Sequence, residues 1–304
     1  MEKRPFKIYL FFSLGFIFML ICAVGAFFYG YKVGTDRAES KSEAKLVAAR
    51  QENRVGTYPQ QDLVSFYHTV LLPYRDFQIA WFASMDKLSS GDATNDNAAI
   101  VKSLSKLAQQ QYDQANSVSV PGSSPLLQEA QTNYLKGLKL FSTGTSNFIS
   151  KANTLPSTLI PEQLNKDEYI QNAVKLTLLA QDQLYDAVLN WSNSVQPNIP
   201  KQVNYQPNLT ITEWKTFPLA VKNAIITSIL YEKRMYQPYY PQDTVAKVDQ
   251  MINNGQASQL NMKSISQLVA LLHSTDAIKT NEFIRNKNRM YSKETLPQLP
   301  FFYE

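Results

Sequence analysis

The chain has 304 residues, of which 44% are hydrophobic and 18% are charged, with a formal net charge of +5. Its single cysteine, Cys22, excludes a disulfide framework and a cysteine-rich metal site within the chain. Four of the 30 basic residues and one of the 25 acidic residues lie in positions 1–32, so the remainder carries 26 and 24, a net charge of only +2, which does not favour nucleic acid as a partner.

An apolar stretch without a charged side chain runs from Ile8 to Tyr31, after a short basic tail. As a helix rising ~1.5 Å per residue it would reach about 36 Å, more than the ~30 Å hydrocarbon core of a bilayer. Aromatic residues gather at both ends, as is usual at membrane interfaces. We therefore expect residues 8–31 to be a single transmembrane anchor and residues 1–7 a cytoplasmic tail.

Other interpretations of this stretch fit its sequence less well. A cleavable signal peptide has a shorter apolar region, although Val24-Gly25-Ala26 resembles a cleavage site. Lipidation of Cys22 would need a small preceding residue, where Ile21 stands. Basic residues also follow the stretch, so charge counting does not set its orientation. A short basic tail before an apolar run is nevertheless typical of a signal anchor, and we expect the bulk of the chain to be extracytoplasmic.

Residues 32–56 are predicted to form a helical stalk. From Asp36 to Arg54 the sequence lacks glycine and is rich in Ala, Glu, Lys and Arg, a composition that favours a solvated helix. Gly56 and Pro59 then interrupt the pattern.

Residues 57–200 contain four segments with apolar side chains at helical spacing, which predict a four-helix bundle in an all-α protein. The first segment spans Gln61–Leu88, and Pro73 is expected to kink or divide it. The second begins after Gly91. Its candidate N-terminal caps are Asp92, Thr94 and Asp96.

The third and fourth segments show the clearest apolar stripes. The third begins at Ser124, as cap, and Pro125 in the first helical position. Its stripe is Leu127, Ala130, Tyr134, Leu138, Phe141, Thr145 and Phe148. The fourth segment runs from Pro161 to about Ser194. Its stripe is Tyr169, Ala173, Leu176, Ala180, Leu184, Ala187 and Trp191. Alternation of large and small residues at this spacing suits close antiparallel packing.

Residues 201–304 are predicted to be helical but in shorter pieces. Thr210 and Glu213 have capping-box spacing, and an apolar helix follows Pro218. A short helix is expected to stop at Asn254-Gly255, and a last helical stretch to precede an extended C-terminal tail. Whether these helices form a separate domain or fold onto the bundle is left open by the sequence.

No motif for catalysis, metal binding or cofactor binding is found. The two histidines, His68 and His273, have no partner at a zinc-binding spacing, and no phosphate-binding or nucleophile-elbow glycine pattern occurs. Asp182 and Asp186 stand four residues apart among glutamines, away from the apolar stripe, so we expect them on a solvated helix face rather than in a hydrolase pair. We expect no cofactor and no enzyme activity.

Two surface features are candidates for contact with other molecules. The first is the tyrosine-rich segment between two C-terminal helices, which is expected either to expose aromatic side chains to a protein or glycan or to shield the core. Its candidate contact residues are Tyr231, Lys233, Arg234, Tyr236, Tyr239 and Tyr240. The second is a cationic stretch, expected to be a solvated helix face or to contact an anionic envelope polymer or lipid headgroups. Its residues are Lys279, Arg285, Lys287, Arg289 and Lys293.

These observations favour a non-catalytic protein tethered to the bacterial cell envelope. The expected partners are membrane lipid, through residues 8–31, and an envelope protein bound by the helical part. The alternative is a sensory ectodomain that binds a small ligand between helices and signals through a separate membrane partner. An envelope enzyme is disfavoured because every motif sought for it is missing.

Overall fold

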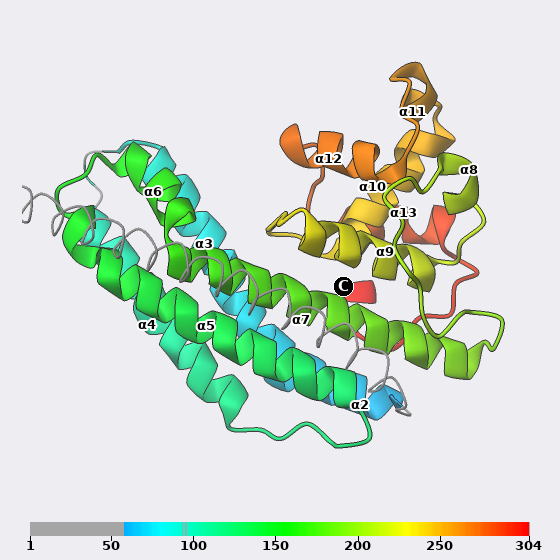
Figure 1. Ribbon diagram of the computed structural model, residues 1–304, viewed down its shortest axis with the longest axis horizontal. Helices are drawn as coiled ribbons and strands as arrows, with labels where there is room; N and C mark the ends of the chain where they lie inside the picture. Colours follow the sequence, from blue (N-terminus) through cyan, green and yellow to red (C-terminus); the bar gives the residue numbers. More distant parts are fainter. Residues whose placement is uncertain (1–57, 93, 95, 304) are drawn as a thin grey trace, which may run out of the picture. The chain divides into compact units, whose positions relative to one another are not determined.

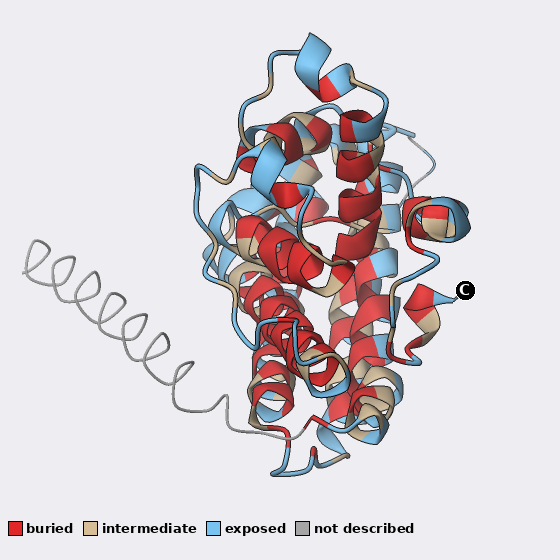
Figure 2. Cartoon of the chain, turned by 90° about the vertical axis from the view of Figure 1, so that its right-hand side faces the viewer, coloured by how far each residue is buried: buried red, intermediate tan, exposed pale blue. Residues whose placement is uncertain are grey.

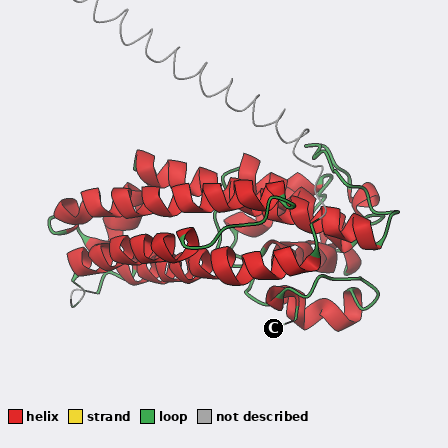
Figure 3. Ribbon diagram, turned by 90° about the horizontal axis from the view of Figure 1, so that it is seen from below, coloured by secondary structure: helices red, strands yellow, loops and turns green. Residues whose placement is uncertain are grey.

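The computed structural model describes residues 58–92, 94 and 96–303, which belong to one compact unit, Gly56–Glu304. Within these ranges the chain is built of helices and loops, and its only β pairing is an isolated bridge between Thr210 and Ser264 (Figure 3). The prediction of an all-α fold is confirmed for this part. No helix in the same ranges combines the length and apolarity of a membrane span. The expected tail, anchor and stalk, residues 1–56, lie outside the described residues.

The first predicted segment forms a continuous helical arm with a change of geometry in its middle. Helix α2, Gln60–Phe66, runs into a π-helical turn, η1, at Tyr67–Leu71, and then into α3, Leu72–Ser89. Pro73 lies in the first turn of α3, directly after the π-helical turn. The interruption expected at Pro73 is therefore one wide helical turn.

Helices α4 and α5 begin where the sequence predicted. Asp96 precedes α4, Asn97–Asn116, and its side chain accepts the N–H of Ala99 at 2.9 Å. Ser124 precedes α5, Pro125–Ala152, but its hydroxyl donates to Asp62 at 2.8 Å instead of capping the helix. All seven residues of the predicted α5 stripe are buried.

The fourth predicted segment is two helices. Asp167 has an extended backbone and accepts the N–H of Ile170 at 3.2 Å, so it separates α6, Ile160–Lys166, from α7, Glu168–Val195. The predicted stripe is wrong at its beginning, where Tyr169 is 44% exposed and Ile170 is buried instead. From residue 177 to residue 192 every side chain of α7 is buried, which no single amphipathic stripe can produce (Figure 2).

Two glycines let α5 and α7 approach closely. A Cβ atom built on Gly137 would lie 2.4 Å from Cγ2 of Thr177, and one on Gly144 would lie 2.8 Å from Cδ1 of Ile170. Both distances are too short for real carbon contacts. Glycine is therefore the residue that this helix pair can accommodate at both positions.

The C-terminal part covers the opposite side of α7. Its helices are α8, Ile211–Trp214; α9, Leu219–Glu232; α10, Pro241–Asn253; α11, Gln256–Gln259; α12, Ile265–Ser274; and α13, Glu282–Met290. The capping box of Thr210 and Glu213 is present. Helix α9 packs on α7 and on α10, and α10 packs on α13 (Figure 1). Because α5 and α9 both pack against α7, that helix is enclosed from two directions.

The last residues fold back into the core instead of forming the expected extended tail. A short 3-10 turn, η3 at Pro300–Phe302, buries Phe301 and Phe302. The ring of Phe301 lies 4.8 Å from that of Tyr240 and 6.2 Å from that of Tyr185, centre to centre. Two adjoining phenylalanines near the C-terminus thus supply core area that a polar tail would not.

Candidate functional site

The tyrosine-rich segment, residues 231–240, runs from the end of α9 to the residue before α10. Tyr236 is half-buried; its hydroxyl lies 3.1 Å from that of Tyr74 on α3, and its ring centre lies 5.1 Å from that of Phe82, with the two rings tilted. Burial raises the pKa of Tyr236 well above its usual value. Tyr239 is only 4% exposed. The expectation of exposed aromatic side chains is therefore wrong for Tyr239, and the alternative, in which tyrosines shield the core, describes this half of the segment.

Two side chains of α3 hold this segment by its backbone. Arg75 donates to the carbonyl of Pro238 at 2.8 Å, and Gln78 donates to the carbonyl of Gln237 at 2.9 Å. The Arg75 guanidinium also lies 4.3 Å from the ring centre of Tyr240. Buried polar side chains that bind a loop's carbonyls fix its path, because breaking those bonds would leave buried groups unpaired.

The other three predicted contact residues lie at the beginning of the segment. Lys233 and Arg234 are exposed, and Tyr231 is half-buried with the Arg234 guanidinium 5.3 Å from its ring centre. They lie at the end of α9, where Arg234 has a left-handed backbone with φ of 54°. The structure thus brings these three together and separates them from the anchored tyrosines.

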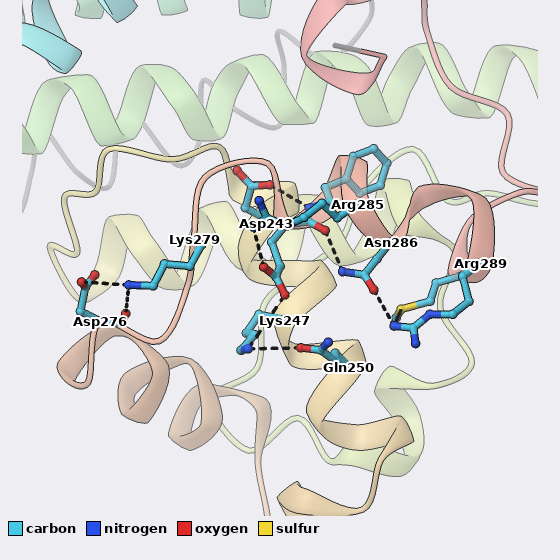
Figure 4. A network of polar contacts seen from close by, with 11 residues as sticks. Asp243, Lys247, Gln250, Asp276, Lys279, Arg285, Asn286 and Arg289 are labelled. Atoms are coloured by element: carbon cyan, nitrogen blue, oxygen red, sulfur yellow. Dashed lines mark hydrogen bonds and ion pairs between the residues drawn. The ribbon is translucent and has the colours of Figure 1, made fainter.

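The cationic stretch is divided between α13 and its flanking loops, and most of its charges have local partners. Lys279 lies 3.5 Å from a carboxylate oxygen of Asp276, and Arg285 donates to Glu282 at 2.9 Å (Figure 4). The ammonium of Lys287 lies 3.7 Å from the ring centre of Tyr303. Such pairing reduces the net positive charge offered to a polyanion.

Arg289 and Lys293, the remaining two residues of the stretch, are exposed. Arg289 donates to Asn286 on the same helix. Figure 4 shows Arg285, Asn286 and Arg289 along α13, opposite Gln250 and Lys247 of α10. The five cations therefore do not form one continuous face.

The prediction that Asp182 and Asp186 lie on a solvated helix face is wrong. Their side chains are only 1% and 6% exposed. Thr227 and Ser228 of α9 donate to Oδ1 of Asp182 at 2.9 and 3.0 Å. Polar side chains in this part of α7 are bound by neighbouring helices: Asp182 by α9, and Gln183 by Asn133 and Glu129 of α5. Sequence periodicity could not show this, since a polar helix face is the same whether water or another helix satisfies it.

The C-terminal helices form an open pocket of about 790 Å³, which we call the Asp249 pocket. Its charged lining consists of Lys215, Lys222, Asp249, Arg289 and Glu294. Lys215 lies in the loop before α9 and Lys222 in α9 itself. Asp249 lies in α10, Arg289 in α13 and Glu294 in the turn after α13. A volume of this size is within the range of small-molecule sites.

Asp249 is the most heavily bonded group of the pocket. Its Oδ1 accepts Nε1–H of Trp214 at 2.6 Å, and its Oδ2 accepts the hydroxyl of Tyr291 at 2.7 Å. Lys222 donates to both oxygens, at 3.0 and 2.9 Å. Asp249 and Lys222 are both buried, so this is an ion pair largely removed from water.

Burial changes the acidity of two neighbours of this pair. The pKa of Tyr291 is raised, first by burial and then by the adjacent Asp249 carboxylate. The pKa of Glu294 is also raised by burial, although one of its oxygens accepts the N–H of Leu219 at 3.2 Å. Tyr291 therefore stays protonated as a donor, and Glu294 is a weaker acid than an exposed glutamate.

The Asp249 pocket was not predicted from the sequence. Lys222 is the only charged residue between Leu219 and Leu230, a run that is otherwise rich in apolar residues. A lone lysine in such a run needs a buried partner, and this signal could have identified it. No comparable sequence signal identifies Asp249, because its partners Trp214 and Tyr291 lie 35 and 42 residues away in the sequence.

Neither histidine lines the Asp249 pocket. His68 is exposed, with its ring centre 4.9 Å from that of Tyr67, and His273 is half-buried, which lowers its pKa. In the described part of the chain, no group of three or more His, Cys, Asp and Glu side chains is arranged to hold a metal ion.

Comparison with known proteins gives no match at any level. No family model matches the sequence, no curated protein matches it, and no solved structure matches the fold.

Proposed function

We propose that this chain is a single-pass membrane protein with its N-terminus in the cytoplasm and a helical extracytoplasmic part that acts as a non-catalytic interaction or scaffold component of the bacterial cell envelope. The tether is the uncharged stretch Ile8–Tyr31. The interacting part is the helical unit that follows, with membrane lipid and one envelope protein as partners.

The observation that carries the non-catalytic role is how the buried carboxylates are used. Asp249 accepts four short contacts from three side chains, and Asp182 binds two hydroxyls of α9. Asp243 accepts the N–H groups of Tyr240 and Phe283. A general base needs an oxygen that is free to reach a substrate proton, whereas these oxygens join helices to one another.

The tether is tested by fractionating cells that express the tagged full chain. We expect the protein in the membrane fraction, extractable by detergent but not by high salt. The variant Ile17→Lys/Leu20→Lys places two charges inside the apolar stretch, and we expect it to lose membrane retention, because each buried lysine costs about 2.5–3.5 kcal/mol in a bilayer. Recovery of the unaltered chain in the soluble fraction contradicts the proposal.

The interaction role is tested by crosslinking in whole cells followed by purification in detergent. We expect one stoichiometric protein partner. Lys233→Glu/Arg234→Glu alters the exposed end of the tyrosine-rich segment, and we expect it to reduce the recovery of that partner. Lys102→Glu/Lys106→Glu, two exposed positions on α4, is the matched control. Equal loss of the partner in both variants would exclude the proposed contact.

A second candidate function is supported by the Asp249 pocket. A sensory ectodomain needs a cavity of ligand size with a few polar groups, and this pocket has both. Signalling would then pass through a separate membrane partner. Thermal unfolding of the full chain in detergent, with and without a desalted and protein-free cell extract, tests this candidate: a bound metabolite is expected to raise the unfolding temperature.

A further inference from the structure

We propose that the Asp249 pocket binds a small organic molecule that carries one acidic group, a carboxylate or phosphate, beside uncharged hydrogen-bonding groups. This inference rests on the second candidate function and names its ligand class. It is independent of the membrane tether.

Asp249 itself has no capacity left for a cationic ligand. A carboxylate offers about four lone-pair positions. Trp214, Tyr291 and Lys222 together make four contacts of 2.6–3.0 Å with its two oxygens. A ligand amine would have to displace one of these donors from a buried site, so Asp249 acts as the support of the pocket and not as its recognition group.

Lys222, by contrast, retains a donor. Its ammonium has three N–H groups, and both of its hydrogen bonds go to Asp249. Among the described residues it has no other acceptor, while Trp214 lies beside it with its ring centre 5.4 Å away. Because Lys222 is buried and lines the cavity, an acceptor that binds there would form a charge-assisted hydrogen bond away from bulk water.

The rest of the charged lining is also weighted toward cations. Lys215 and Arg289 are exposed at the pocket, and the opposing carboxylate is Glu294. Three cations and two carboxylates give a net charge of +1, and Asp249 is already neutralised by Lys222. Burial, together with the nearby Asp249, raises the pKa of Glu294, while Lys222 and the N–H of Leu219 lower it. The raised value makes Glu294 less repulsive to an anion.

The uncharged residues that line the pocket indicate which other chemical groups the ligand carries. Gln250, Asn253 and Asn254 offer amide donors and acceptors, and Phe217 and Ile252 offer apolar surface. Amides recognise hydroxyl or amide groups of a ligand, and the apolar residues suit a short carbon skeleton. A hydroxy acid or an N-acylated amino acid matches this combination.

The test is isothermal titration of the full chain, purified in detergent, with lactate, N-acetylglycine and inorganic phosphate as probes. Glycerol and ethanolamine serve as uncharged and cationic comparators. We expect a carboxylate probe to bind and the comparators not to bind. Binding of phosphate alone would support the acidic group and identify inorganic phosphate as its source.

Variants locate the bound probe. Lys215→Met and Arg289→Gln alter exposed residues, and each is expected to weaken binding about two- to fivefold. Lys222→Met/Asp249→Asn removes the buried donor without leaving an unpaired charge, and we expect a loss of at least about tenfold. Lys233→Met is the matched control outside the pocket and should leave affinity unchanged.

Three results would overturn the proposal: no binding by any anionic probe, preferential binding of ethanolamine or glycerol, or equal affinity in the pocket variants and in Lys233→Met. The cell-extract experiment separates this failure from failure of the sensory function. If the extract stabilises the chain and the anionic probes do not bind, ligand binding stands and the ligand class is wrong. If neither has an effect, both are wrong.

Discussion

The Arg75 guanidinium lies 4.3 Å from the ring centre of Tyr240, and through this contact α3 of the bundle meets the residue that immediately precedes α10. The same guanidinium donates to the Pro238 carbonyl and to Gln78. It is 5% exposed and has no carboxylate within ion-pair distance in the described ranges. One cation thus joins the bundle to the C-terminal helices by hydrogen bonds and ring stacking.

This arrangement predicts that Arg75→Lys destabilises the protein although it keeps the charge. A lysine ammonium cannot donate to two acceptors in the planar fork while covering the ring of Tyr240, so we expect a loss of about 1–3 kcal/mol in the free energy of unfolding. Chemical denaturation followed by circular dichroism measures it. Arg285→Lys is the control, because Arg285 is exposed and lies beside Glu282; a change within about 0.5 kcal/mol is expected there.

Gly137→Ala is expected to loosen the contact between α5 and α7. The added methyl would lie 2.4 Å from Thr177, so side chains or backbone must shift, at a cost of about 1–3 kcal/mol. Gly122→Ala is the matched control, since a Cβ at Gly122 has nothing within 4 Å. Thermal unfolding of both variants decides the matter; if they melt together, the two helices are not packed as closely as described.

Lys222→Met is expected to cost about 3–5 kcal/mol, because it leaves the Asp249 carboxylate buried without its cation. Adding Asp249→Asn should restore part of that loss, since it removes the unpaired charge, and the amide oxygen can still accept from Trp214 while the amide NH2 donates to the hydroxyl of Tyr291. A double-mutant cycle from denaturation curves measures the coupling. Additive effects of the two substitutions would show that the pair is not coupled in solution.

Glu294→Gln is expected to change how stability depends on pH. The folded-state pKa of Glu294 lies above its ordinary value of 4.5, so the glutamate stabilises the fold only while it is protonated. Below that ordinary value the variant and the unaltered protein should be equally stable. As pH rises through the folded-state pKa the unaltered protein should lose stability relative to Glu294→Gln.

Glu162→Gln provides a control of opposite sign for this pH series. The Lys166 ammonium beside Glu162 lowers the pKa of that carboxyl, so its ionised form is favoured by folding. Any stability from this pair is present above pH 4.5 and is lost as pH falls through the folded-state pKa. Melting temperatures should be measured from pH 4 to 8. As pH rises, the melting temperature relative to that of the unaltered protein should increase for Glu294→Gln and decrease for Glu162→Gln.

Phe301→Ala tests whether the C-terminal residues belong to the core. The side chain is 5% exposed and packs against Tyr67, Tyr185 and Tyr240, so its removal should cost about 3–5 kcal/mol. Tyr303→Ala, at a position 50% exposed, should cost no more than about 1 kcal/mol. If both variants unfold at the same denaturant concentration as the unaltered chain, the tail is not part of the core in solution.

The candidate site was the least predictable part of the described chain. Each of its charged residues has an ordinary sequence neighbourhood except Lys222, which stands alone in an apolar run. The residues that bind Asp249 come from positions 214, 222 and 291, and only folding brings them within 3 Å of it. A local pattern cannot encode such a contact, because neither helix periodicity nor capping depends on distant partners.

The sequence by itself determined the helical character of the described part, the α5 stripe from Leu127 to Phe148, the Asp96 cap and the capping box at Thr210. These features depend on residues within one or two helical turns. Tertiary structure alone decided that α7 is enclosed, that Asp182 binds α9, and that Phe301 enters the core. The reason is that burial depends on what covers a surface, and the covering helix lies far away in the chain.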